Sequence, residues 1–486
     1  MNNENYIPIF DSLDGIYSTH LLQQGVRYES LRQAFKDLYS LDPEFIARSP
    51  GRVNLIGEHI DYSNFGVLPM AIERDLLIAV ATTTTDSRVR IANMDTRFPA
   101  REFDFEGKES IVSIDATVLE WSNYFKCGYK AILEKLKLDK PRGMYMLVHG
   151  TVPTGAGVSS SAAFVCAAAV ATLRANNGTL TKKELTELAI VGERNVGVNS
   201  GGMDQSASVF AERGHAVHIE FWPTLLPKPV ALSDPKLVFV VANTLVQADK
   251  HVTAPTNYNL RVVETKIGAL ALSKALGIAD KETYREVLDT YFAGRSELSM
   301  QERLAMMLDL VERHFVKQEG YTQQELAQLI GMDEALMVSK YMTRFPVRCD
   351  KFQLYKRAKH VFSEALRVLQ FRDVCLDSAD PFYELGALMN ASQESCRDLY
   401  NCSCNEIDEL TQICRNAGAS GSRLTGAGWG GCTVSLVREE RVEDFIREVK
   451  QQYYSKKFPF MTDSELEDVI FATKPGSGAA IFVINQ

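Results

Sequence analysis

Four short segments of the chain combine glycines with charged or hydroxyl side chains, and together they could bind and activate a polar ligand. The first is residues 49–62, SPGRVNLIGEHIDY, which places Arg52, Glu58, His59 and Asp61 on a short strand and the turn after it. Carboxylates and an imidazole on one loop suit hydrogen bonding to several hydroxyls of a sugar. A surface turn with solvated charges is the alternative interpretation of this segment alone.

The second segment is residues 153–163, PTGAGVSSSAA, in which a glycine-rich turn leads directly into an alanine-rich helix. Gly155 and Gly157 let the backbone turn sharply and come close to a ligand. The serines that follow lie where the amides of a helix N-terminus lack partners, and both groups suit a phosphate or its Mg²⁺. An N-capped core helix after a turn is the alternative. The chain has no G-x-x-x-x-G-K-[ST] sequence, which excludes the common P-loop.

The other two segments present glycines beside an expected strand or a single acid. Residues 421–432, GSRLTGAGWGGC, are rich in glycine and precede an expected strand, which indicates close approach of the backbone to another group. A tight turn without a ligand is the alternative. Residues 201–205, GGMDQ, present one acid, Asp204, after two glycines. Each segment alone is ambiguous, but their joint occurrence is not.

Composition and charge exclude several other classes of protein. The 486 residues include 53 Lys and Arg against 62 Asp and Glu. The chain therefore has no excess of cationic side chains for nonspecific binding to nucleic acid or to an anionic membrane. The first 13 residues lack a basic region followed by an apolar run, so no secretory signal is expected. The nine cysteines are scattered without a metal-binding pattern. These features predict a reduced, cytoplasmic protein that does not span a membrane.

The four segments need strands and helices to position them, and the length predicts two to three domains. In the N-terminal half, residues 1–40 read as a helical extension, and a mostly buried helix is expected over 158–174. Short runs rich in strand-forming residues lie at 52–56, 76–80 and 144–148. The first expected strand therefore carries the arginine of the first segment, and the expected helix starts at the glycine-rich turn of the second.

In the C-terminal half, residues 222–229 contain three prolines and mark the expected boundary between the halves. Residues 261–345 are expected to be largely helical, and the other expected elements are strands at 237–242, 433–437 and 480–484 and helices at 352–370 and 404–417. Strands and helices are grouped rather than strictly alternating, which favours an α+β fold. The predicted division is an N-terminal extension (1–40), an N-terminal domain (41–225) and a C-terminal domain (226–486).

In this order and spacing, the four segments resemble those of the GHMP kinase superfamily, and specifically those of the galactokinases. Residues 52–61 resemble the galactokinase signature, residues 153–163 the phosphate loop and residues 423–431 the C-terminal glycine motif. Residues 121–127 and 253–261 are most similar to the fungal members. The resemblance implies a two-domain α+β fold with an active site in the interdomain cleft and a ferredoxin-like core in the C-terminal domain. It also implies transfer of the γ-phosphate of ATP to the C1 hydroxyl of galactose.

The same resemblance implies roles for individual residues on the sugar side of the site. Asp204 resembles the base that accepts the proton of the C1 hydroxyl, and Arg52 resembles the cation beside it. The residues implied to bind the sugar are Arg52, Glu58, His59, Asp61, Asp204 and Tyr258. One departure is visible at Ser200, where fungal relatives often have Asn, and it leaves one sugar or loop contact undetermined.

On the nucleotide side, the resemblance implies that Mg²⁺ is held by Ser161 and Glu193. The loop implied to surround the β- and γ-phosphates consists of Gly155, Ala156, Gly157, Val158, Ser159, Ser160 and Ser161. Trp121 is expected to contact the adenine. These residues would be sufficient for phosphoryl transfer, because a protein catalyses that reaction mainly by aligning the reacting groups and neutralising their charge.

Two rival functions remain open on the sequence. An N-acetylgalactosamine kinase would share the scaffold and motifs, although Tyr258 and the fungal-like flanks favour galactose. A galactose-sensing transcriptional regulator would share the fold without catalysis, but the intact Ser161-Ala162 favours an active enzyme. The fungal similarity also raises the hypothesis that the form bound to galactose and ATP engages a transcriptional repressor.

Overall fold

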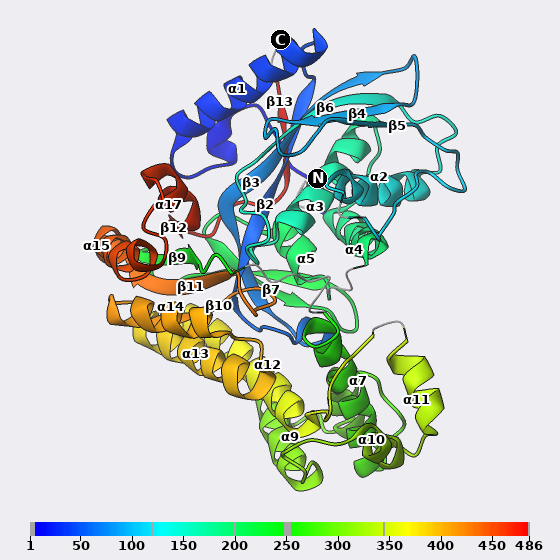
Figure 1. Cartoon of the computed structure of the whole chain (residues 1–486), viewed down its shortest axis with the longest axis vertical. Coiled ribbons are helices and arrows are strands. Elements are labelled where there is room, and N and C mark those ends of the chain that lie inside the picture. The colour runs from blue at the N-terminus through cyan, green and yellow to red at the C-terminus, as the bar shows by residue number, and fades with distance from the viewer. Residues whose placement is uncertain (1–4, 119, 198–200, 247–253, 344–345, 485–486) are drawn as a thin grey trace.

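The computed structural model describes residues 5–118, 120–197, 201–246, 254–343 and 346–484 (Figure 1). Ser200 and Thr253, which were singled out on the sequence, lie outside the described residues. Within the described residues, no helix is both long enough and apolar enough to cross a membrane.

A mixed sheet of seven strands forms the centre of the N-terminal half, in the order β1-β13-β2-β3-β6-β4-β5. Its strands are β1 (Ile9–Phe10), β2 (Phe45–Ile56), β3 (Leu68–Thr83), β4 (Val89–Asn93), β5 (Arg101–Phe103), β6 (Gly143–Gly150) and β13 (Ala480–Val483). The two short runs predicted at 52–56 and 76–80 are parts of the long strands β2 and β3, which pair antiparallel. Every residue of β2 is buried, so side chains on both faces of this strand are covered by protein.

Helices cover both faces of this sheet (Figure 1). One core joins the sheet to α2 (Ser122–Leu136), α3 (Ser160–Ala175) and α4 (Lys182–Glu193), and a second core joins the other face to α1 (Leu21–Tyr39). The buried helix predicted at 158–174 is confirmed as α3, whose alanines favour the helical conformation and leave room for close neighbours. Gly128 of α2 shows that closeness, because a Cβ there would lie 2.5 Å from the Val165 carbonyl oxygen.

The C-terminal sheet has four antiparallel strands in the order β10-β11-β9-β12. The strands are β9 (Leu237–Asn243), β10 (Gly421–Leu424), β11 (Cys432–Arg438) and β12 (Ile470–Thr473). Helices that contact this sheet include α13 (Pro381–Ser395), α14 (Asn405–Asn416), α15 (Val442–Val449) and α17 (Asp463–Val469). In chain order the strands lie 4-1-3-2, with helices between the first and second and between the third and fourth. This arrangement is the ferredoxin-like core that was predicted.

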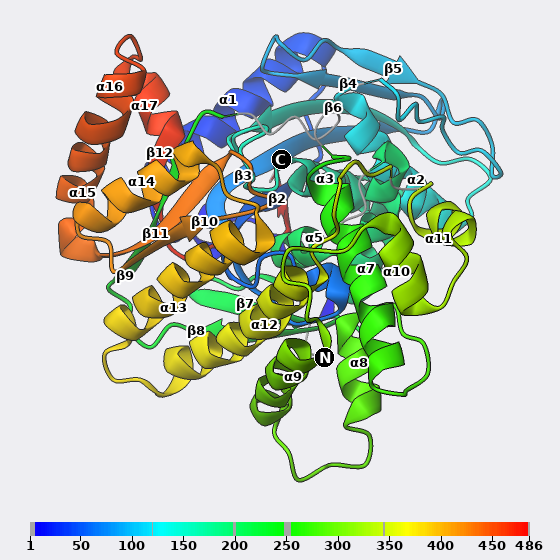
Figure 2. The same ribbon diagram turned by 60° about the horizontal axis from the view of Figure 1, so that its bottom comes forward.

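A group of helices stands apart from both sheets and is seen at the bottom of Figure 1 and from another side in Figure 2. It contains α7 (Tyr258–Ala275), α8 (Tyr284–Tyr291), α9 (Met300–His314), α10 (Gln323–Ile330) and α11 (Glu334–Tyr341), and α12 (Leu354–Asp377) packs against α7 and α9. The helical character predicted for 261–345 is confirmed for its described residues, and the helix predicted at 352–370 is α12. The helix predicted at 404–417 is confirmed as α14.

Two of the three sheets take strands from both sides of the predicted domain boundary at 225 and 226. That boundary falls in the loop between β7 (His215–Glu220) and β8 (Leu226–Ala231), two strands that pair with each other. The last strand, β13, pairs with β2 in the N-terminal sheet, and β1 of the N-terminal extension pairs with β13. The exact division into domains therefore stays a prediction, while the two-part α+β architecture is confirmed by the sheets.

Candidate active site

The first glycine-containing segment packs against the second at Gly51 of β2. The register with β3 shifts between Pro50 and Arg52, where the single residue Gly51 of β2 lies opposite residues 72–74 of β3. A Cβ on Gly51 would lie 2.8 Å from both a Val152 methyl and the Val158 carbonyl oxygen, so the strand and the loop approach as closely as glycine allows. The Arg52 amide donates to that same Val158 oxygen at 3.1 Å. This close packing places Arg52, the residue after Gly51, directly beside the loop of the second segment.

The guanidinium of Arg52 holds the carboxylate of Asp204. Its Nε and Nη2 lie 2.8 Å and 2.7 Å from Asp204 Oδ1, and its Nη1 donates to the Gly157 carbonyl oxygen at 2.6 Å. Asp204 lies in the first turn of α5 (Met203–Phe210). The N-cap of this helix is Gly202, whose φ of 108° suits glycine. The Arg52 side chain is 5% exposed whereas that of Asp204 is 24% exposed. The acid is therefore fixed on one side and accessible on the other, as a proton acceptor must be.

The carboxyl group of Glu58 is buried in the same region. Its Oε1 accepts a hydrogen bond from the Gly426 amide at 2.9 Å and lies 3.5 Å from Nη1 of Arg423. Burial raises the pKa of Glu58 from 4.5 to about 7, although the charges of Arg423 and Arg52 oppose that rise. The carboxyl group of Glu58, from the first segment, is thus hydrogen-bonded to the backbone of the third segment.

This shifted pKa predicts how stability depends on pH. Because the folded protein binds the Glu58 proton more tightly than the unfolded chain does, this contribution to stability is complete below about pH 4.5 and is lost as the pH rises through 7. Glu58→Gln cannot ionise, so its free energy of unfolding relative to the wild type should rise by up to about 3 kcal/mol from pH 5 to 8. Urea unfolding at a series of pH values measures this difference. For the surface control Glu212→Gln, the free energy of unfolding relative to the wild type should not change with pH. The same constant difference for Glu58→Gln would contradict the assignment.

Asp61 lies between the first segment and the glycines before Asp204. A Cβ on Gly201 would lie 2.4 Å from the Asp61 carboxyl carbon, so only glycine fits beside this acid. Burial, and next the charge of Asp204, raise the pKa of Asp61 to about 6. The Tyr62 amide donates to Asp61 Oδ1 at 3.0 Å. Asp61 and Asp204 are therefore neighbouring acids with different surroundings, one enclosed and the other paired with a cation.

His59 links the turn at residues 57–61 to the third segment. Burial lowers the pKa of His59 to about 3, so its ring is neutral at physiological pH. Nε2 lies 2.8 Å from the Ala427 carbonyl oxygen and must carry the proton, while Nδ1 accepts from the Tyr62 hydroxyl at 3.0 Å. Both ring nitrogens are thus engaged by protein groups in this structure. The predicted contact of His59 with a sugar can therefore come from its ring face or backbone, but not from a free ring nitrogen.

Tyr258, the first residue of α7, lies beside this cluster. Its ring centroid is 5.8 Å from that of His59 and 5.8 Å from that of Tyr62. Burial raises the pKa of Tyr258 well above its ordinary value, and the charges of Asp61 and Asp204 add to the rise. The hydroxyl therefore stays protonated, and α7 brings a neutral hydrogen-bonding group close to the two acids.

The loop at 153–160 has the features that a phosphate requires. Gly155 and Gly157 have φ values of 69° and 77°, and Ser159, with a φ of 63°, is the N-cap of α3. The buried hydroxyl of Ser159 has no hydrogen-bond partner among the described residues. The first amides of a sixteen-residue helix also lack partners within the helix, and they carry its partial positive charge. An orphaned hydroxyl beside such amides fits an anionic oxygen of a nucleotide.

The phosphate loop packs directly on the third segment. The Cys432 amide donates to the Ala156 carbonyl oxygen at 2.9 Å. A Cβ on Gly426 would lie 2.4 Å from the Gly157 carbonyl oxygen, and one on Gly157 would lie 3.0 Å from the Thr425 carbonyl oxygen. The glycines predicted to allow close approach therefore allow it between two backbone segments, one from each half of the chain.

The two residues predicted to bind Mg²⁺ lie at the start of α3 and the end of α4. Ser161 is in the first turn of α3, and Glu193 is the last residue of α4. Glu193 is 3% exposed and accepts a hydrogen bond from Nε2 of Gln205, the residue after Asp204. No group of three or more His, Cys, Asp or Glu side chains that could hold a metal occurs among the described residues. A hydroxyl and one carboxylate fit Mg²⁺, which is commonly bound through one or two carboxylates plus substrate phosphates.

Trp121 lies just before α2 and faces the start of α3. Its ring stacks on Phe164 with the centroids 5.8 Å apart and the planes at 8°, and its Nε1–H donates to the Pro99 carbonyl oxygen at 3.0 Å. The side chain is partly exposed. A flat aromatic face near the phosphate loop is compatible with the predicted adenine contact.

One charged residue of the site was not predicted. Arg423 is fully buried, donates from Nη1 to the Asn54 carbonyl oxygen at 2.8 Å and approaches Glu58. The sequence signal for this residue is a lone arginine in a glycine-rich segment that leads into a strand. An arginine buried at such a place needs a buried acid as its partner, and Glu58 is that acid.

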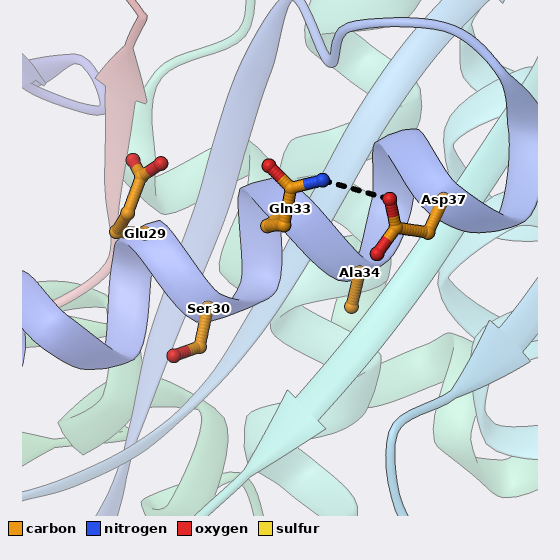
Figure 3. Close-up of a pocket in the computed structure, with 5 residues that line it drawn as sticks. All are labelled: Glu29, Ser30, Gln33, Ala34 and Asp37. Carbon is orange, nitrogen blue, oxygen red and sulfur yellow. Dashed lines mark hydrogen bonds between the residues drawn. The ribbon is translucent and has the colours of Figure 1, made fainter.

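A surface pocket lies elsewhere and involves none of these residues. Figure 3 shows its lining, which comes entirely from α1: Glu29, Ser30, Gln33, Ala34 and Asp37. Gln33 donates to Asp37 within the same helix at 2.7 Å. A shallow surface on one exposed helix lacks the convergent polar groups of the region around Asp204, so the chemistry is assigned to the latter.

Three family models match this chain. Residues 33–82 match the galactokinase galactose-binding signature, residues 123–212 match the GHMP kinases N terminal domain and residues 379–455 match the GHMP kinases C terminal model. The segments around Arg52, the phosphate loop and Asp204, and the C-terminal glycines, fall within these three matches.

Similar proteins extend over nearly the whole chain. A galactokinase of Saccharomyces cerevisiae is 42% identical, with 93% of this chain and 94% of the relative covered. A galactokinase of Schizosaccharomyces pombe is 38% identical, with 96% of each chain covered. The solved structure of Lactococcus lactis galactokinase complexed with galactose matches with a TM-score of 0.70 at 25% identity, covering 93% of this chain and 99% of that one. Methanococcus jannaschii mevalonate kinase shares the fold, with a TM-score of 0.53 at 16% identity and 89% and 98% coverage.

Proposed function

This chain belongs to the galactokinase family of GHMP kinases, and from that premise we propose that it transfers the γ-phosphate of ATP to the C1 hydroxyl of galactose. The products are galactose 1-phosphate and ADP. The observation that carries the proposal is the ion pair of Arg52 and Asp204, which lies beside the buried acids Glu58 and Asp61 and contacts the phosphate loop.

On the sugar side, Asp204 acts as the base. Its accessible carboxylate accepts the proton of the C1 hydroxyl as the new O–P bond forms, while Arg52 holds it in place. Glu58, Asp61 and Tyr258 bind the remaining hydroxyls. Enclosed groups of this kind select one arrangement of hydroxyls, because a mismatched sugar leaves them without partners.

On the nucleotide side, the loop from Gly155 to Ser161 cradles the phosphates with backbone amides and hydroxyls, and Trp121 contacts the adenine. Ser161 and Glu193 hold Mg²⁺, which neutralises charge on the phosphates when it is bound. Arg52 bonds both Asp204 and the Gly157 carbonyl, so one side chain aligns the base with the loop that holds the transferred group.

The metal assignment predicts the effect of Ser161→Ala. Loss of one ligand should raise the Mg²⁺ concentration needed for half-maximal rate by about tenfold and lower kcat, with little change in KM for galactose. Titration of the initial rate with Mg²⁺ at saturating ATP measures the change. Glu193→Gln should shift the curve in the same direction, and an unmoved curve for both variants would contradict the assignment.

The substrate is tested by comparing kcat/KM for galactose, N-acetylgalactosamine and glucose in an assay of ADP release. Galactose should give the highest value, and glucose should be disfavoured because its C4 hydroxyl has the opposite configuration. A higher value for N-acetylgalactosamine would favour the alternative kinase. Absence of turnover with every sugar, together with galactose binding, would favour the sensor.

Two further elements of the proposal concern the cell. We place the protein in the cytoplasm, where its substrate ATP is available. The nine cysteines are free, as expected in a compartment that keeps thiols reduced. The hypothesis of a transcriptional repressor as partner stays a prediction from the fungal similarity. Affinity capture with the tagged chain, with and without galactose plus ATP, tests it, and recovery of no regulatory protein in either condition would leave the metabolic role alone.

A further inference from the structure

Helix α12 contacts the turn at residues 57–61, although the helix lies outside the three segments that match family models. His360, Glu364 and Val368 follow one another at intervals of four residues, so they lie on one face of the helix. All three are buried, and all three approach residues 57–58. One helix face is thus built against the turn that carries Glu58 and His59.

Glu364 holds the amide at the start of this turn. The Gly57 amide donates to Glu364 Oε1 at 2.9 Å, and the Ser392 hydroxyl donates to the same oxygen at 2.6 Å. Arg367 donates from Nε to Glu364 Oε2 at 2.8 Å. Burial alone would raise the pKa of Glu364, but the charge of Arg367 leads the groups that lower it to about 2. The acceptor is therefore charged, fully buried and fixed from several sides.

His360 holds the carbonyl group of the next residue. Its Nε2 lies 3.0 Å from the Glu58 carbonyl oxygen, and its Nδ1 lies 2.8 Å from the Ser395 hydroxyl. A carbonyl oxygen can only accept, so Nε2 carries the proton, and Nδ1 accepts from Ser395. Burial lowers the pKa of His360 to about 4, which keeps the ring neutral with a single tautomer.

The turn needs this support because its backbone is in a sparsely populated conformation. Gly57 has a φ of 107°, and His59 has a φ of 61°, which is uncommon for a residue with a side chain. Such conformations cost free energy and persist when their surroundings over-determine them. Val368 closes the space beside Gly57, where a Cβ would lie 3.0 Å from a Val368 methyl.

We propose that His360 and Glu364 are positioning residues for sugar binding: they hold the Gly57–Glu58 peptide groups and thereby aim the Glu58 carboxyl group at the substrate. The inference rests on the proposed function, since it takes Glu58 as a sugar ligand. Among the described residues, no hydrogen bond or ion pair joins either side chain to the phosphate loop, so the effect of losing them should fall on galactose and not on ATP.

Two amide variants of His360 separate the contact with Glu58 from the contact with Ser395. In His360→Gln the amide nitrogen can take the place of Nε2 and still donate to the Glu58 carbonyl. In His360→Asn the shorter amide can reach only the position of Nδ1. His360→Asn should raise KM for galactose about tenfold, the cost of one lost hydrogen bond to a buried group, with KM for ATP unchanged. His360→Gln should stay within about twofold of the wild type for both substrates.

Two more variants make the result decisive. Glu364→Asp keeps the charge beside Arg367 but withdraws the carboxylate from the Gly57 amide, so it should raise KM for galactose in the same way even if His360→Asn does not fold. Cys375→Ala, further along the same helix and 1% exposed, serves as the control for general loosening of α12 and should leave both KM values unchanged.

The pattern of KM values decides the outcome. Equal changes in KM for galactose and ATP would overturn the inference and leave a purely structural role. So would an unchanged KM for galactose in His360→Asn and Glu364→Asp while the melting temperature falls. Failure of the wild type to phosphorylate galactose would instead overturn the proposed function, so the two failures are distinguishable.

Discussion

Asp204→Asn should give a folded protein that binds galactose and ATP and has lost nearly all of its turnover. The amide oxygen can still accept from Arg52, so the ion-pair geometry is largely preserved, but the side chain can no longer take a proton. General bases typically contribute roughly 10²–10⁴ to the rate, and kcat should fall by an amount in that range. Steady-state assays of ADP release measure kcat, and calorimetric titration with galactose measures binding.

The surface variant Asp377→Asn is the matched control, because it makes the same chemical change at an exposed end of α12. It should keep the kcat of the wild type. Retention of more than about a tenth of kcat in Asp204→Asn would remove this residue from the role of base, given the usual size of that contribution.

The features that could be predicted from the sequence are those that depend on local residue types. The alanine-rich run after Gly157 predicts a buried helix, and α3 is that helix. The glycines of 421–432 predict close backbone approach, and Gly426 packs against Gly157 as glycine alone permits. Asp204 after two glycines was expected to be presented to a ligand, and its carboxylate is the partly exposed member of the Arg52 pair.

The features that could not be predicted depend on contacts between segments far apart in the chain. His360 and Glu364 sit in an ordinary amphipathic helix, and nothing local distinguishes them from other buried polar residues. Their partners at residues 57–58 lie about three hundred positions away, at sequence separations of 302 and 307. The engagement of both His59 nitrogens has the same origin, since Ala427 is 368 residues distant. The pairing of β13 with β2 likewise required the whole fold.

The second large effect is expected at Arg52. Arg52→Lys keeps the positive charge but replaces a rigid fork of donors with one ammonium group. In the native protein Nε and Nη2 hold Asp204 while Nη1 holds the Gly157 carbonyl, so the base and the phosphate loop share one rigid group. A single nitrogen cannot occupy all three positions. The base and the transferred phosphate should therefore lose their mutual alignment, and kcat should fall about 10²–10³-fold, the range found when one preorganised electrostatic group is removed.

The same substitution on the surface isolates this effect. Arg397 forms an ion pair with Asp398 at 2.8 Å, with both side chains largely in solvent, so Arg397→Lys should leave kcat unchanged. In Arg52→Lys, affinity for galactose measured by titration should change far less than kcat, because Glu58 and Asp61 remain in place. If charge alone were needed at this position, Arg52→Lys would retain more than about a third of kcat. That result would show that Arg52 acts as a point charge, and the link it makes between Asp204 and Gly157 would have no role in alignment.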